Sequence, residues 1–243
     1  LVIYGFFSRK PATRDAPMRV VPLTTLSGSE SWPEFSPDGT QLAFTWDGGV
    51  SGADQVYITL VGAVGSRQIT SDPRYSYSAP SWSPDGRQLA AGRCLSGNRP
   101  PCEIRLISPL GGQDTKFNES RPVGKAAWSP DGRFLAAALG PQSGYAEGTG
   151  IFLLPVAGGA VRRLTAPTAR GFEFSPAFSR DGRSLAYVSC VDPNGLDCDV
   201  YLATLASTLD ISGAPHPVTH HAGMIRGGLA LKCHRLAEVR PPE

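Results

Sequence analysis

Short apolar segments alternate with polar turns rich in Gly and Pro along most of the chain. One turn recurs four times at intervals of 47, 46 and 50 residues, and Leu-Ala follows three residues after each of its glycines. The four copies are Phe35-Ser36-Pro37-Asp38-Gly39, Trp82-Ser83-Pro84-Asp85-Gly86, Trp128-Ser129-Pro130-Asp131-Gly132 and Phe178-Ser179-Arg180-Asp181-Gly182. Such spacing predicts repeated pairs of short strands, each pair joined by a tight hairpin.

The chemistry of this turn explains why it recurs. Pro presets φ for the second position of a type I turn, Asp suits the third position, and Gly takes the left-handed conformation that follows. Arg180 replaces Pro in the fourth copy and should make that turn less rigid. We therefore interpret the Asp of each turn as structural rather than catalytic.

A second apolar segment follows each hairpin, at residues 56–58, 104–106, 151–154 and 200–202, and further turns such as Gly111-Gly112 and Gly158-Gly159 come after it. Each unit therefore predicts four antiparallel strands. One such sheet cannot bury both of its faces, but sheets that stack around an axis can. The chain is predicted to be all-β, a β-propeller with four complete repeats plus a fragment near 227–230. The four turn aromatics should be buried between adjacent blades.

The repeated aromatic-Ser-Pro-Asp-Gly-x-x-Leu-Ala pattern resembles the TolB-like, WD-repeat-like propeller family over residues 19–230. The start of this region, Arg19-Val20-Val21-Pro22-Leu23-Thr24, follows a short apolar run and a linker. That arrangement resembles the extracytoplasmic propeller of bacterial CadC-like membrane-anchored winged-helix regulators. The resemblance implies six blades and a role in binding or sensing.

Both ends depart from the repeat. Residues 1–7 are apolar or Gly, and we interpret them as the end of a truncated membrane span, although an edge strand or a frayed terminus would fit as well. Residues 8–18 predict a linker. Residues 231–243 are off the pattern, either because the reading frame fails there or because the natural C-terminus is short.

Four of the five cysteines occupy equivalent positions in the second and fourth repeats, 12 and 20 residues after the aromatic. Cys94 and Cys102, and likewise Cys190 and Cys198, flank the loop between the second and third strands. Cysteines at the two ends of a hairpin loop can reach disulfide distance, so we predict the pairs Cys94–Cys102 and Cys190–Cys198 and an oxidising compartment. Four free thiols packed as small apolar residues are the alternative.

Composition excludes some functions. The 23 basic and 21 acidic residues give a net charge of +2, which offers no electrostatic reason for this segment to bind nucleic acid. The hydrolase, nucleotide-binding and zinc-protease motifs are not in the sequence. We therefore expect no catalytic residue, no cofactor and no metal ligand.

The expected function is a non-enzymatic binding or sensing propeller of a membrane-anchored transcriptional regulator, on the periplasmic face of the bacterial inner membrane. A TolB-like periplasmic scaffold is an alternative. So is the propeller of a membrane serine/threonine kinase or of a prolyl-oligopeptidase-type peptidase. The partner would be a protein or a small envelope ligand, and the membrane would be reached only through the N-terminal segment.

Binding is expected on the face opposite the repeated turns, because that face carries longer and chemically different loops. Exposed Tyr and Arg are typical binding anchors. The candidate residues on this face are Arg74, Tyr75, Tyr77, Arg99, Tyr145, Arg170, Phe172 and Glu173.

Overall fold

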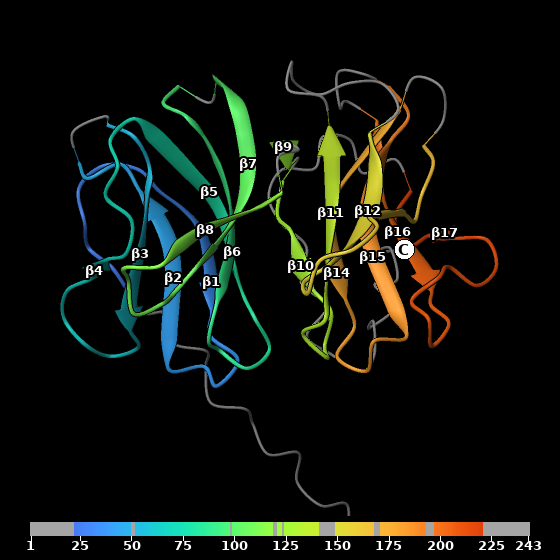
Figure 1. The fold of residues 1–243 in the computed structure, drawn as a ribbon, viewed down its shortest axis with the longest axis horizontal. Helices are drawn as coiled ribbons and strands as arrows, with labels where there is room; N and C mark the ends of the chain where they lie inside the picture. The colour runs from blue at the N-terminus through green and yellow to red at the C-terminus, as the bar shows by residue number, and fades with distance from the viewer. Residues whose placement is uncertain are drawn as a thin grey trace, which may run out of the picture.

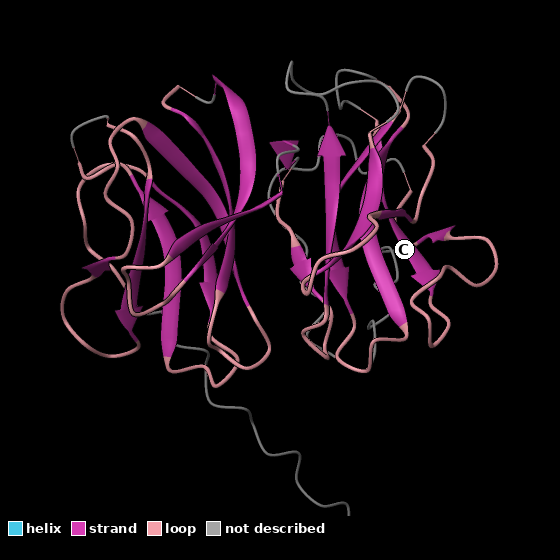
Figure 2. Ribbon diagram, viewed as in Figure 1, coloured by secondary structure: helices cyan, strands magenta, loops and turns pink. Residues whose placement is uncertain are grey.

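A computed structural model describes residues 22–49, 52–97, 99–118, 121–122, 124–140, 149–167, 171–192 and 197–220. Every regular element in these ranges is a β-strand, which confirms the all-β prediction (Figure 2). The predicted span, linker and tail, at 1–7, 8–18 and 231–243, lie outside the described residues, as does the predicted fragment near 227–230.

The strands form four antiparallel sheets, which we call blades one to four. Blade one contains β1 (Glu30–Phe35), β2 (Gln41–Trp46), β3 (Gln55–Leu60) and β4 (Arg67–Gln68). Blade two contains β5 (Tyr75–Trp82), β6 (Leu89–Leu95), β7 (Arg99–Ile107) and β8 (Asp114–Asn118). Blade three contains β10 (Ala127–Trp128), β11 (Phe134–Gly140), β12 (Gly150–Pro155) and β13 (Arg162–Arg163), with β9 (Arg121–Pro122) paired to β11. Blade four contains β14 (Phe172–Phe178), β15 (Ser184–Cys190), β16 (Cys198–Thr204) and β17 (His216–Pro217).

The four blades are arranged as a β-propeller (Figure 1). In each blade the strands alternate in direction. The first-to-second and third-to-fourth connections therefore share one end, the turn face. The second-to-third connections and the links between blades lie at the other end, the loop face. Consecutive blades contact each other, but among the described residues no contact joins blade one to blade four.

The core lies between the blades. Trp82 and Trp128 are buried, and each indole N–H donates to a carbonyl oxygen of the preceding blade, Glu34 O at 3.1 Å and Ser81 O at 3.0 Å. Phe178 is buried at the same position of blade four. The prediction is wrong for Phe35, which is 40% exposed, because no described blade packs against blade one on that side.

Each Ser-Pro-Asp-Gly turn is held by its own Ser. In the first copy the Ser36 hydroxyl donates to Asp38 Oδ1 at 2.6 Å and accepts from the Gln41 N–H at 2.9 Å. The same pair of bonds recurs in the other three turns. The hydrogen bond from Ser36, with those from Thr40, lowers the pKa of Asp38. These bonds support a structural role for the Asp.

Successive turns also pack against one another. A Cβ placed on Gly132 would lie 3.8 Å from the Pro84 ring, and one on Gly182 would lie 3.7 Å from the Pro130 ring. The third such contact is between Gly86 and Pro37, at 3.9 Å. The repeated Pro therefore serves two purposes: it shapes its own turn and supports the turn of the next blade.

Candidate binding site

Among the eight predicted face residues, the structure separates those whose side chains it describes into two groups, one at the surface and one buried. Arg74 is exposed in the turn before β5, and Tyr75 is half-buried at the start of that strand. Arg99 lies in β7, where only its backbone is described, whereas Tyr145 and Arg170 lie outside the described residues.

Three of the predicted face residues are not exposed loop residues, and the prediction of their exposure is wrong. Tyr77 in β5 is 2% exposed, and Phe172 and Glu173 in β14 are also buried. The first strands of blades two and four begin earlier than the turn motif suggested, so these side chains lie within the sheets. Tyr77 packs against blade one, Glu173 contacts Thr165 of blade three, and Phe172 packs within blade four. The alternation Phe172-Glu173-Phe174 was the available signal, because it is typical of a strand.

Tyr77 belongs to a network of charged side chains in blade two. Its hydroxyl donates to the Asp114 carboxylate, and burial raises the pKa of Tyr77. Arg93 donates to Glu103 at 2.8 Å, and Arg105 Nε lies 2.6 Å from Asp114 Oδ1. All four charged side chains are more than two thirds buried. Since each charge has an opposite partner, none of these buried charges is left uncompensated, and removing one partner would destabilise the blade.

The exposed part of the predicted face is a small surface that we call the Arg74 surface, formed by Asp72, Arg74 and Tyr75. Arg74 and Asp72 form an ion pair at 2.7 Å, and hydrogen bonds from Arg74 lower the pKa of Asp72 to about 2. Two guanidinium groups lie close to the Tyr75 ring, with the Arg93 carbon 4.1 Å and the Arg74 carbon 5.5 Å from its centroid. A rigid aromatic ring flanked by charge is suited to binding a partner.

Glu173 is a buried carboxyl at the junction of blades three and four. It accepts a hydrogen bond from the Thr165 hydroxyl of the preceding blade. Burial raises the pKa of Glu173 to about 7, although Thr165 and Arg163 act in the opposite direction. The residue is 5% exposed, so it can titrate near neutral pH without offering a surface to a ligand.

Both predicted disulfides form. Cys94–Cys102 and Cys190–Cys198 have S–S distances of 2.05 and 1.97 Å, and each pair faces across neighbouring strands at the loop face. All four cysteines are buried. Disulfides persist in oxidising compartments, so they indicate an extracytoplasmic location.

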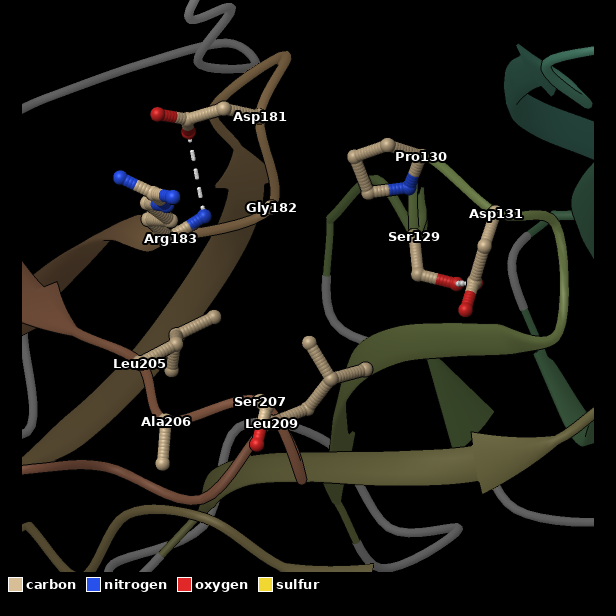
Figure 3. Close-up of a pocket in the computed structure, with 10 residues that line it drawn as sticks. All are labelled: Ser129, Pro130, Asp131, Asp181, Gly182, Arg183, Leu205, Ala206, Ser207 and Leu209. Atoms are coloured by element: carbon tan, nitrogen blue, oxygen red, sulfur yellow. Dashed lines mark hydrogen bonds between the residues drawn. The ribbon is translucent and has the colours of Figure 1, made fainter.

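The turn face also has a cleft, which sequence reasoning did not predict. It measures about 380 Å³ and lies between the repeated turns of blades three and four (Figure 3). Ser129, Pro130 and Asp131 line one side of the cleft, and Leu205 and Leu209 line its floor. The Ser129 hydroxyl and the Arg133 N–H already bind the Asp131 carboxylate. The cleft therefore combines an apolar floor with two turn carboxylates, Asp131 and Asp181, that are already hydrogen-bonded within their turns.

Leu209 in this cleft has φ +63°, a conformation that bulky side chains rarely adopt. Its N–H donates to Ala206 O at 2.9 Å, as the Gly111 N–H donates to Ser108 O in blade two. Leu209 therefore occupies a position where blade two has a glycine with φ +84°. In exchange, its side chain packs against the core between blades three and four.

Two further searches apply to the described ranges only. No group of three or more His, Cys, Asp or Glu side chains is arranged to hold a metal ion there. No helix in these ranges has the length and hydrophobicity that a membrane crossing needs.

No family model matches the sequence. Among solved structures, the chain is similar to a putative TolB from Agrobacterium tumefaciens, with 21% identity and a TM-score of 0.62 over 78% of this chain and 65% of that protein. It is also similar to TolB from Acinetobacter baumannii, with 22% identity and a TM-score of 0.63 over 79% of this chain and 44% of that one. Prolyl oligopeptidase B from Galerina marginata matches at 14% identity and a TM-score of 0.56, over 80% of this chain and 32% of its own.

At these identities the likeness establishes the fold alone. The chain spans about two thirds of the Agrobacterium protein and less than half of the other two. The chain therefore shares the propeller fold of TolB proteins and of a prolyl oligopeptidase.

Proposed function

We propose that this chain is a non-enzymatic binding module that works outside the cytoplasm, as the sensing propeller of a membrane-anchored transcriptional regulator. The observation that carries the proposal is the pair of buried disulfides at equivalent positions of blades two and four. A regulator of this type keeps its DNA-binding part in the cytoplasm and senses on the other side of the membrane.

The arrangement of the sequence supports this membrane-anchored design. An apolar run at 1–7 and a Pro-containing linker at 8–18 precede the propeller, as expected for a domain tethered to a span. The Arg74 surface lies on the loop face, where binding is expected, and its ring and charges are already ordered by Asp72 and Arg93. A protein or a small envelope ligand would be recognised there.

The test uses the full-length protein in its native host. Arg74→Ala and Tyr75→Ala should change the transcription of target genes in response to the signal while the protein level in the membrane stays the same. Arg87→Ala is the matched control, because Arg87 is an exposed arginine on the turn face. Equal transcription in all variants, or cysteines that are free to alkylate in intact cells, would contradict the proposal.

A second candidate is a periplasmic scaffold that binds partner proteins, which the similarity to TolB propellers favours. Cross-linking in intact cells distinguishes the two. A scaffold should cross-link to envelope proteins through the loop face, and deleting residues 19–230 should leave transcription unchanged. A kinase or peptidase domain in the same polypeptide would support the remaining alternatives.

A further inference from the structure

Exposed aliphatic side chains gather on the turn face, at the third-to-fourth turns of blades one and two. Val64 is fully exposed and Leu110 is 82% exposed in these turns, and Leu60 and Val61 beside Val64 are exposed as well. We call these four residues the aliphatic rim. Single exposed aliphatic residues are common on proteins, but several together on protruding turns mark a surface that contacts another molecule or a membrane.

Arg67 holds the two turns of the aliphatic rim together. From β4 of blade one, its guanidinium group donates to two carbonyl oxygens of the blade-two turn, Pro109 O at 2.5 Å and Leu110 O at 2.8 Å. A hollow of about 480 Å³ lies beside the blade-one turn, and Leu60, Val64 and Arg67 are among the residues that line it. The two turns therefore present one surface rather than two independent loops.

Backbone groups at the tips of these turns have partners within the same turn. In blade one the Ala63 N–H donates to Leu60 O at 3.1 Å. In blade two the Gly111 N–H donates to Ser108 O at 2.9 Å, and the Leu110 N–H donates to the Ser108 hydroxyl oxygen at 3.2 Å. An apolar medium penalises polar groups that have no partner. Because these bonds close within the turns, the tips can leave water without breaking them.

The charges around the aliphatic rim fit a phospholipid headgroup. Residues 60–66 and 108–113 contain no acidic side chain. Arg67 binds only carbonyl oxygens in the described part of the chain, so its positive charge has no carboxylate beside it. The nearest repeated turn does carry an acid, Asp38, but its carboxylate is held by the Ser36 and Thr40 hydroxyls. Aliphatic tips next to a cation suit the boundary between acyl chains and phosphates.

The same pattern continues in blade three and ends in blade four. The third-to-fourth turn of blade three, residues 156–161, is also without charge, and Val161 in it is 45% exposed. In blade four the corresponding turn contains Asp210, which pairs with Arg162 at 2.8 Å, and its Leu209 packs against the core. The apolar part of the turn face therefore lies over blades one to three.

We propose that the turn face docks on the surface of a phospholipid bilayer, with Val64 and Leu110 at the acyl boundary and Arg67 at the headgroup phosphates. A protein partner would need a matching hollow for each tip, whereas fluid lipid fits around protruding aliphatic side chains of any shape. The proposal rests on the membrane-anchored placement proposed above, because a tether keeps the turn face near lipid and lets weak contacts suffice. The loop face and its Arg74 surface would then point away from the bilayer, towards a ligand.

Flotation of the purified full chain with vesicles of phosphatidylethanolamine and phosphatidylglycerol tests the docking. A few inserted aliphatic side chains bind no more strongly than one acyl chain, so binding should be measured at about 1 mM lipid. Val64→Asp and Leu110→Asp should each weaken binding about tenfold, because each removes one inserted aliphatic side chain. Val191→Asp is the matched control, since Val191 is 50% exposed on the loop face, and it should float as the unchanged chain does.

A variant with the opposite effect keeps the test sharp even if an Asp variant folds poorly. Val64→Trp should tighten binding, because an indole favours the membrane interface. Binding should also persist in about 1 M NaCl, where exposed charges are screened within about 3 Å, since the aliphatic contacts dominate.

Two outcomes would overturn the proposal. Equal flotation of all variants would show that another part of the chain carries the lipid binding. A chain that does not float, but whose self-association or cross-linking to an envelope protein is lost in Val64→Asp, would show that the aliphatic rim is a protein contact. Flotation does not involve transcription, so its failure would leave the sensing role of the Arg74 surface to its own test.

Discussion

The junction of blades one and two and the junction of blades three and four share one backbone plan. In each, the residue five positions before the turn aromatic donates its N–H to the preceding blade. Tyr77 N donates to Asp54 O and Glu173 N donates to Thr149 O, both at 2.8 Å. The side chains at this position differ: Tyr77 carries a phenol and Glu173 a carboxyl.

A threonine hydroxyl supports both junctions. Thr70 accepts the N–H of Val56 at 2.9 Å, and Thr165 accepts the N–H of Ile151 at 2.8 Å. Of the two, only the Thr165 hydroxyl also donates a hydrogen bond to an acid, the Glu173 carboxylate. At the first junction the phenol is bound by the paired charges of blade two, and an indole hydrogen bond joins the two blades. The second junction contains an ionisable group without a full counter-charge. The backbone sets the architecture, and the side chains decide how each junction responds to pH.

The largest expected effect breaks the first junction. Trp82→Ala should lower the free energy of unfolding by about 3–5 kcal/mol, because it opens a cavity between blades and removes the bond to Glu34 O. Urea unfolding measures this change. Trp82→Phe should lose about 1 kcal/mol, mainly the hydrogen bond. Phe35→Ala is the control, and a loss as large as that of Trp82→Ala would contradict the exposed position of Phe35.

The second junction should depend on pH. The pKa of Glu173 is raised from 4.5 to about 7 in the folded state. Its contribution to stability is therefore complete below pH 4.5 and is lost as pH rises towards 7, by about 3 kcal/mol at most. Glu173→Gln should flatten this slope in urea unfolding measured between pH 4.5 and 8.

Glu30→Gln is the matched control for that experiment. Glu30 occupies the corresponding position of blade one, but it is exposed and accepts a hydrogen bond from Thr24 at 2.8 Å. The slope should survive in this variant. A slope that also survives in Glu173→Gln would show that other groups produce it.

Removal of a disulfide should have a similar effect in either blade. Each closes a loop with a sequence separation of 8, so replacing Cys190 and Cys198 by Ser should cost about 2–3 kcal/mol through the entropy of the unfolded chain. The same change at Cys94 and Cys102 should cost about as much. Urea unfolding of both double variants compares them, and a much smaller loss in one blade would show that its hairpin is held by other contacts.

The smallest expected effect is at the irregular fourth turn. Arg180→Pro should raise the free energy of unfolding by about 0.4–1 kcal/mol, because Pro suits this position in the other three turns and restricts the unfolded chain. Pro130→Ala should lose that amount and, in addition, the contact with Gly182. If Arg180→Pro and Pro130→Ala change the free energy of unfolding by equal and opposite amounts, the contact between turns contributes nothing to stability.

The repeated turn predicted the blades, their number in the described ranges, the two end faces and both disulfides. It did so because turn geometry and hairpin spacing are local properties. The predicted burial of Phe35 was wrong, since burial depends on a neighbouring blade that the repeat alone does not guarantee. Tyr77 and Glu173 were misplaced because their strands begin seven and six residues before the aromatic, beyond the motif. The cleft at Leu209 could not be foreseen, because it arises between blades from a turn that departs from the Gly pattern.

The contact between successive turns makes each repeat directional. The first three units each present a proline ring to the unit after them, and the last three each present a glycine to the unit before them, so the two sides of a repeat are complementary but not alike. Contacts of this head-to-tail kind extend until they close on themselves. A repeat could therefore be duplicated or exchanged as a whole without inventing a new interface, provided that the cut falls between turns. Such a chain could lengthen by duplication of whole repeats, while the loops of the opposite face change in sequence.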